Sequence, residues 1–238
     1  METSNTNQHI SQRFDEEMEG LRNKVLKMGG LVEKQIDAAV DALQNMDAAA
    51  ADKVILRDHK VNALEVSIDE ECTRILAKRQ PAASDLRMVV AVIKTITDLE
   101  RIGDEAEKIA KMAVHISEQD GHFRSKYSGI RHLADHVKQM VHDVLDAYAR
   151  LDVDAALRVV REDAEADEDY QSIIRTLITF MMEDPRTISE VLDVVWAARS
   201  LERIGDHAKN IGEYVIYLVK GKDVRHLDLN AIENDILS

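Results

Sequence analysis

The chain has 238 residues, and its 31 lysine and arginine residues against 45 aspartate and glutamate residues give a formal net charge of −14. Such an acidic chain lacks the basic face that nucleic-acid binding requires, and it is unsuited to electrostatic attachment to anionic lipid. Because the N-terminus has neither the basic nor the apolar part of a signal peptide, and no apolar run approaches the roughly 20 residues that span a bilayer, we expect a cytoplasmic protein.

Apolar residues at helical spacing predict that the first half begins with two long helices. Residues 1–9 are polar and are predicted to be a disordered tail. The first helix is expected to start near Ile10 and to end at Asp47. The second is expected to end before Pro81, because proline lacks a backbone N–H and disfavours helix in the preceding residue.

A third helix has the clearest pattern in the chain. Ser84 can cap its first turn, and its apolar positions step by four and three residues from Met88 to Ala113, as in a helix-packing seam. Residues 10–118 are therefore predicted to form one three-helix bundle. Residues 119–128 contain a glycine among mixed polar residues and are predicted to be a linker.

The second half repeats this plan over residues 129–221. Asp152 is expected to close a fourth helix, and Pro185 to separate a fifth from a sixth. Gly221 stands where a C-terminal helix cap is expected. We assign residues 222–238 to a C-terminal tail and make no secondary-structure prediction for them.

A hexapeptide is duplicated in the two halves. Leu99–Asp104 recurs without change as Leu201–Asp206, close to half a chain length later. An identical segment at that separation indicates two copies of one structural unit. With few aromatic residues and only two prolines, the composition fits an all-helical protein. The predicted fold is all-α: two pseudo-symmetric antiparallel three-helix bundles.

Each hexapeptide interrupts an apolar stripe with a glutamate, a glycine and an aspartate that lies one helical turn beyond the glutamate. Glycine inside a helix costs about 1 kcal/mol relative to alanine. Its presence at the same place in both halves suggests the close approach of another backbone or of a bound group. The four carboxylates concerned are Glu100, Asp104, Glu202 and Asp206.

Oxygen donors one turn apart also occur on the preceding helix of each half, and they are Asp58, Asn62, Asp163 and Asp167. If they face the first four across a groove, the buried carboxylates require protonation or cations such as Mg²⁺, Mn²⁺, Fe²⁺ or Zn²⁺. Two other interpretations remain open: each acidic pair lies on a solvated face, or Arg101 and Arg203 neutralise it.

Other candidates are weaker. His132 and His136 have the one-turn spacing of a zinc pair but no evident third ligand, so an exposed face is favoured. His207 is a possible extra ligand in the second half only. Cys72, the single cysteine, lies on an apolar stripe and is predicted to be core. The sequence contains no phosphate loop, nucleophile elbow or zinc-protease motif.

These features resemble the PhoU family, the accessory and regulatory proteins of bacterial high-affinity phosphate uptake. The resemblance extends over nearly the whole chain and is carried by Gln8–Phe14, Met28–Glu33, Arg79–Arg87 and both hexapeptides. It implies two symmetric three-helix bundles and metal ions at the repeated acidic motifs. Because Asn62 stands where the other half has Asp167, the first site carries one negative charge fewer and is expected to hold fewer metal ions or to bind them more weakly.

The resemblance also implies a role. A PhoU-like protein is expected to act as a non-enzymatic negative regulator of the phosphate-starvation (Pho) regulon. It would contact the ATPase subunit of the phosphate ABC transporter and the phosphate sensor histidine kinase, and it would meet the membrane only through these partners. Spare apolar faces on helical bundles favour a homodimer as well.

Two further hypotheses compete with this one. A metal-dependent hydrolase or oxidase would use the same carboxylates, but it needs an acid–base group, for which His207 is the only evident candidate. A purely structural helical dimer would leave the acids solvated.

Overall fold

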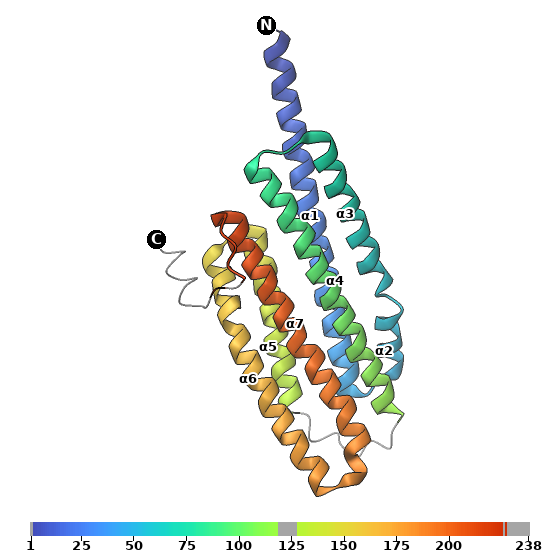
Figure 1. Ribbon diagram of the computed structural model, residues 1–238. Coiled ribbons are helices and arrows are strands. Elements are labelled where there is room, and N and C mark those ends of the chain that lie inside the picture. The colour runs from blue at the N-terminus through green and yellow to red at the C-terminus, as the bar shows by residue number, and fades with distance from the viewer. Residues whose placement is uncertain (1, 119–127, 226, 228–238) are drawn as a thin grey trace.

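The computed structural model describes residues 2–118, 128–225 and 227, and for residues 2–13 and 128 it describes the backbone alone. Within these ranges every regular element is a helix (Figure 1). The elements are α1 (Glu2–Asn45), α2 (Ala48–Ile55), α3 (His59–Arg79), α4 (Ala83–Ser117), α5 (Ser128–Arg150), α6 (Val153–Glu183), the 3₁₀ turn η1 (Pro185–Thr187) and α7 (Ile188–Lys220).

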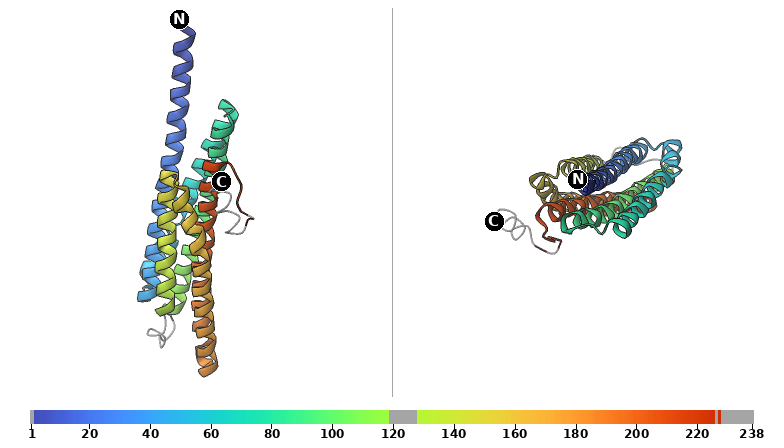
Figure 2. Two further views of the ribbon diagram at one scale, coloured as in Figure 1. Left: turned by 90° about the vertical axis from the view of Figure 1, so that its left-hand side faces the viewer. Right: turned by 90° about the horizontal axis from the view of Figure 1, so that it is seen from above.

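The helices form two bundles that lie side by side. The first contains α1, α2 with α3, and α4, and the second contains α5, α6 and α7. The main contact between the bundles is that of α4 with α7, and α1 packs against α5 behind it (Figure 2). This arrangement confirms the predicted all-α fold. Among the described residues, none of the helices is long and apolar enough to cross a membrane.

The apolar seams are buried from Val92 to Ala113 on α4 and from Val194 to Val215 on α7. Leu99 and Ile102 of α4 and Leu201 and Ile204 of α7 are fully excluded from solvent. Each such side chain contributes about 2 kcal/mol of burial free energy, which explains why amphipathic helices of this length are stable only as a bundle. Cys72 belongs to the same core, as predicted, and burial raises the pKa of its thiol to about 12.

The second helix of each bundle begins with an aspartate whose side chain caps its N-terminus. Asp47 precedes α2 and accepts a hydrogen bond from the backbone N–H of Ala50 at 2.9 Å. Asp152 precedes α6 and accepts one from Ala155 at the same distance. The residue before each aspartate adopts a left-handed conformation that reverses the chain. These aspartates therefore end one helix, as predicted, and also cap the next.

Two helix starts differ from the sequence prediction. Helix α1 begins at Glu2, so residues 2–9, predicted as a disordered tail, are helical and extend beyond the bundle (Figure 2). Once a helix has nucleated, each added residue costs little. The cap of α4 is Ala82 rather than Ser84, and it makes no side-chain capping bond. Pro81 ends the preceding helix as expected, with Gln80 in the left-handed region.

The single helix predicted between Asp47 and Pro81 is two helices. Leu56–Asp58 form a turn between α2 and α3, where hydrogen bonds run from Arg57 N to Val54 O and from Lys60 N to Arg57 O, both at 3.0 Å. The equivalent part of α6 is continuous. Asp58 therefore sits at a helix break in the first bundle only.

The predicted linker 119–128 lies outside the described residues except for Ser128, which begins α5. Gly221 caps α7 at φ 73°, as predicted, and the tail beyond it is described only at residues 222–225 and 227.

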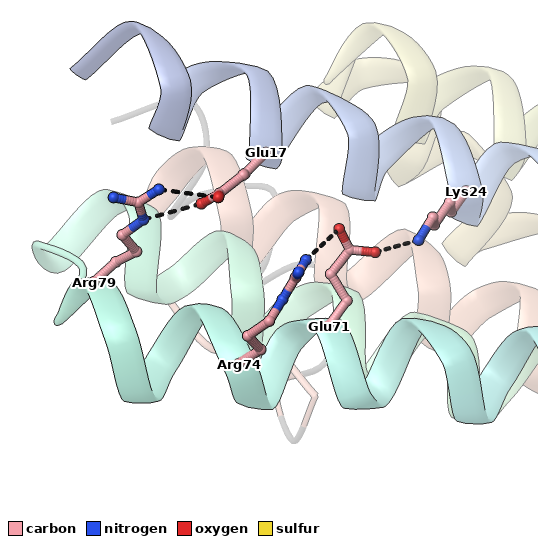
Figure 3. Close-up of polar contacts among 5 residues, drawn as sticks. All are labelled: Glu17, Lys24, Glu71, Arg74 and Arg79. Carbon is pink, nitrogen blue, oxygen red and sulfur yellow. Dashed lines mark hydrogen bonds and ion pairs between the residues drawn. The ribbon is translucent and has the colours of Figure 1, made fainter. Parts of the chain in front are cut away.

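Ion pairs join α1 to α3 along one edge of the first bundle (Figure 3). The guanidinium of Arg79 donates to both carboxylate oxygens of Glu17, at 2.9 and 3.0 Å. About two turns before Arg79 on α3, Glu71 accepts hydrogen bonds from Arg74 at 3.2 Å and from Lys24 of α1. These contacts hold the C-terminal half of α3 against α1, and so fix the helix that carries one side of the first acidic groove.

Candidate metal centres

The first cluster consists of Asp58 and Asn62 at the start of α3 and Glu100 and Asp104 on α4. The carboxylate of Asp58 is buried, with only 7% of the residue exposed. It accepts hydrogen bonds from Gln35 Nε2 at 2.8 Å and from Asn62 Nδ2 at 3.0 Å. Gln35, on α1, also donates to the carbonyl of Gly103 at 3.2 Å. One glutamine thus joins all three helices at this point.

The carboxylates of the first cluster oppose one another's ionisation. Burial and the charge of Asp104 raise the pKa of Glu100, and burial and Asp58 raise the pKa of Asp104. Glu65, one turn beyond Asn62 on α3, interacts electrostatically with the same cluster, because burial and the charges of Asp69 and Asp104 raise its pKa. Like charges held together out of water are costly, so this groove favours protons or cations.

The second cluster consists of Asp163 and Asp167 on α6 and Glu202 and Asp206 on α7. Asp163 and Glu202 are buried, at 6% and 7% exposure. Burial and Asp206 raise the pKa of Glu202 to about 7, and burial and Asp163 raise that of Asp206. The predicted pairs therefore do come together across α6 and α7.

Two basic side chains enter the second cluster. Lys209 Nζ donates to Asp163 Oδ2 at 2.6 Å. Arg199 pairs with Glu202, and its guanidinium lies 5.7 Å from the ring centroid of Tyr170. Part of the negative charge in this groove is therefore neutralised by the protein itself.

The cations of the first cluster stand at other positions, where the charges of Arg101 and Lys108 partly offset the raised pKa values of Glu100 and Asp104. The residues at the equivalent positions of α4 are Glu107 in place of Lys209 and Thr97 in place of Arg199. Glu65 moreover adds a carboxylate where the second repeat has Tyr170. The exchange of Asp167 for Asn62 is therefore one of several charge differences between the two grooves, and the weaker metal binding expected of the first site stays a prediction.

The hexapeptide glycines differ in how closely they are approached. A Cβ added at Gly103 would lie 3.4 Å from Asp58 Oδ1, whereas one at Gly205 would meet nothing nearer than Met140 Cε at 3.7 Å. The close approach of another backbone occurs instead at Gly212, where a Cβ would lie 3.1 Å from the carbonyl oxygen of Ala156. Of the two alternatives expected at Gly103 and Gly205, the close backbone contact is found instead two turns further along α7, and a bound group stays a prediction.

The donor atoms in the two clusters suit hard or borderline cations. Across the described ranges, no three aspartate, glutamate, histidine or cysteine side chains converge as they stand into a metal-binding group. Asn62 Oδ1 and Glu202 Oε2 are nevertheless buried oxygen atoms without a hydrogen-bond partner among the described residues. Such atoms are the donors that a bound ion would use.

The remaining candidates have other partners. His132 and His136 both lie near Asp169, with ring nitrogens 3.5 and 3.4 Å from its Oδ2. His207 lies between the bundles, where its Nδ1 is 2.7 Å from Asp98 Oδ1 of α4. The guanidinium of Arg203 lies 2.9 Å from Glu105, and that of exposed Arg101 lowers the pKa of Glu100 through its charge.

Sequence reasoning missed Gln35, Glu65 and the pairing of Arg199 and Lys209 with the second cluster. Glu65 continues the helical stripe of Asp58 and Asn62, so the periodicity that identified those two could have identified it. Gln35 carries no such signal, because its role depends on how α1 packs against α3 and α4.

Comparison with known proteins gives one consistent result. The family model of the PhoU domain matches the chain twice, over residues 25–113 and 130–215. A "Phosphate-specific transport system accessory protein PhoU homolog" of Pseudomonas putida is 54% identical over 228 residues, which are 96% of this chain and 89% of that protein. The "Phosphate-specific transport system accessory protein PhoU" of Escherichia coli K12 is 49% identical over 227 residues, or 95% and 93% of the two chains.

Solved structures agree. The crystal structure of PhoU from Pseudomonas aeruginosa superposes with a TM-score of 0.85 at 52% identity, covering 88% of this chain and all of that one. The phosphate transport system regulatory protein PhoU from Streptococcus pneumoniae gives 0.83 at 28% identity, covering 89% and 99%. With each of its two bundles matched by the same domain, the chain belongs to the PhoU family.

Proposed function

We propose that this chain is a non-enzymatic regulator of phosphate homeostasis. It couples the ATPase subunit of the phosphate ABC transporter to the phosphate sensor histidine kinase, and it represses the phosphate-starvation regulon when phosphate is plentiful. The observation that carries this proposal is similarity over nearly the full length of both repeats to proteins named as accessory to phosphate-specific transport.

The shape of the molecule is consistent with an adaptor. Helices α4, α6 and α7 have 35, 31 and 33 residues, so the two bundles are elongated and their outer surfaces are long. His207, the evident acid–base candidate for a hydrolase, is 6% exposed and lies against Asp98 of α4, at the contact between the bundles and not in the groove between α6 and α7. The hydrolase hypothesis therefore gains no support from this residue.

The two acidic clusters are proposed to hold divalent cations, with Mg²⁺, Mn²⁺, Fe²⁺ or Zn²⁺ as the candidates. Asp58, Asn62, Glu100 and Asp104 would hold ions in the first repeat, and Asp163, Asp167, Glu202 and Asp206 in the second. A bound ion would supply charge neutralisation, which offsets the burial and the mutual repulsion that raise the pKa values of these groups. The pairs α3–α4 and α6–α7 would thereby be fixed relative to each other.

A reporter strain tests the regulatory proposal. Deleting the gene for this chain is expected to raise alkaline phosphatase activity in phosphate-replete cells, and supplying the chain from a plasmid should restore the low level. Unchanged activity on deletion would contradict the proposal.

Elemental analysis tests the metal proposal. The double variant Glu100→Ala, Glu202→Ala is expected to lose bound metal while its far-UV circular dichroism stays helical. The matched control is Glu70→Ala, Glu168→Ala, which removes two exposed glutamates from the neighbouring helices α3 and α6. Equal metal content in the cluster variant, the control and the parent would refute the assignment.

A further inference from the structure

A pocket of about 290 Å³ opens between the C-terminal half of α4 and the N-terminal half of α7, two helices that run side by side (Figure 1). Met112 and Trp196 supply apolar walls, and Lys108 and Arg203 line it as well. Trp196 is the only tryptophan of the chain and is 62% exposed. An exposed indole beside a pocket is characteristic of a binding surface rather than of a core.

The charge of this pocket is opposite to that of the chain as a whole. Its one carboxylate, Glu105, is 2% exposed, and its Oε1 lies 2.9 Å both from Lys108 Nζ and from a guanidinium nitrogen of Arg203. Two cations thus meet one buried anion and leave positive charge at the rim. In a protein of net charge −14, such a site selects acidic partners.

The other end of the same α4–α7 contact shows how an equivalent surface is filled. Lys94 stands at the position of Trp196 in the first repeat, and its ammonium lies 5.4 Å from the ring centroids of both Tyr214 and Tyr217. Asp98, at the position of Ser200, is buried and bonded to His207 and to Asn210. Side chains of the bundle itself therefore satisfy one another there.

The chain after α7 completes that end. Val224 is 1% exposed and belongs to the hydrophobic core, and Asp223 beside it has its pKa lowered to about 2 by hydrogen bonds from Arg225 and by the charges of Arg225 and Lys94. The segment that contains buried Val224 and the carboxylate of Asp223 thus lies near Lys94, at the symmetry-related surface. The pocket at Trp196 has no such cover among the described residues.

We propose that the Trp196 pocket docks a segment of a partner protein in which an aliphatic or aromatic side chain is flanked by carboxylates. The apolar side chain would pack against Trp196 and Met112, and the carboxylates would meet Lys108 and Arg203. This inference rests on the proposed function, because an adaptor acts through contacts with its partners, and it names the surface and the chemistry of one such contact.

Site-specific cross-linking tests it in the full chain. The chain is expressed with the photo-cross-linking residue benzoylphenylalanine in place of Trp196, in cells that lack the natural gene and grow with ample phosphate. The cells are irradiated, and the peptide that becomes attached to residue 196 is sequenced. The expected product is a segment of another protein with an apolar residue beside aspartate or glutamate. Lys108→Glu should lower its yield about tenfold, because reversing a rim charge weakens complementary association. Lys53→Glu, the same change at an exposed position of α2, should leave the yield unchanged.

The remaining outcomes overturn the proposal. They are no cross-link, a cross-link to a second copy or to any other segment of the same chain, a product rich in lysine and arginine, and a yield that Lys108→Glu does not alter. Alkaline phosphatase is measured in the same cells. If it stays low while no acidic segment is captured, the docking proposal fails and the regulatory one stands. If the unmodified chain cannot restore repression, the regulatory proposal has failed.

Discussion

Neutralising Glu202 should stabilise the metal-free protein at alkaline pH. The folded chain holds this carboxyl with a pKa of about 7, raised from 4.5 by burial and by Asp206. Between these two values the unfolded chain has released the proton that the folded chain keeps. The free energy of unfolding therefore falls as pH rises through this window, and the full cost is present above pH 7.

The size of the effect follows from the shift. Each pKa unit corresponds to 1.36 kcal/mol, so a rise from 4.5 to about 7 corresponds to about 3 kcal/mol. Screening by solvent around half-exposed Arg199, which pairs with Glu202, reduces this to about 2 kcal/mol. Glutamine keeps an oxygen for Arg199 and removes the charge, so Glu202→Gln should recover this amount at about pH 8 and about a quarter of it at about pH 5.

Urea unfolding followed by circular dichroism, with a chelator present, measures the difference. Glu70→Gln is the control, because Glu70 is an exposed glutamate in the middle of α3, and it should leave the free energy of unfolding unchanged at both pH values. A Glu202→Gln variant that is no more stable than the parent at pH 8, or that gains equally at pH 5, would refute the reasoning.

Two further predictions concern packing. Gly205→Ala should raise the free energy of unfolding by up to about 1 kcal/mol, because the added Cβ makes only ordinary contacts and alanine has the higher helix propensity. Gly212→Ala should lower the free energy of unfolding, because its Cβ would lie 3.1 Å from the carbonyl oxygen of Ala156. Thermal denaturation should therefore show a raised melting temperature for the first variant and a lowered one for the second. Asp98→Ala should cost about 3 kcal/mol by leaving His207 and Asn210 without their shared acceptor, and a loss below about 1 kcal/mol in denaturant titrations would argue against a structural role for this contact.

The helical seams were predictable from the sequence because helical periodicity is a local signal. The steps of four and three along Met88 to Ala113 identified α4, and the duplicated hexapeptide identified its partner α7. Proline and glycine marked the ends of α3 and α7 for the same reason. The all-α fold of two bundles follows from these patterns together.

The break before Asp58 could not be predicted in this way. No proline or glycine lies between Ala48 and Arg79, so the sequence indicates one helix. The turn at Leu56–Asp58 accompanies hydrogen bonds that bring Asp58 to Gln35 and Asn62, and these depend on the position of α1. Tertiary contacts override local propensity here.

The eight oxygen donors of the candidate site were identifiable from spacing, but their charge balance was not. Lys209 lies on the same stripe as Glu202, yet its pairing with Asp163 depends on the distance between α6 and α7. A one-dimensional pattern finds which residues share a face, and it does not find which residues from another helix meet them.

The regulatory account is tested most directly by one genetic measurement. In phosphate-replete cells that lack both this chain and the phosphate sensor kinase, alkaline phosphatase activity should stay as low as in the parent strain, because derepression is proposed to run through the kinase. High activity in the double deletion, equal to that in cells lacking this chain alone, would contradict the account.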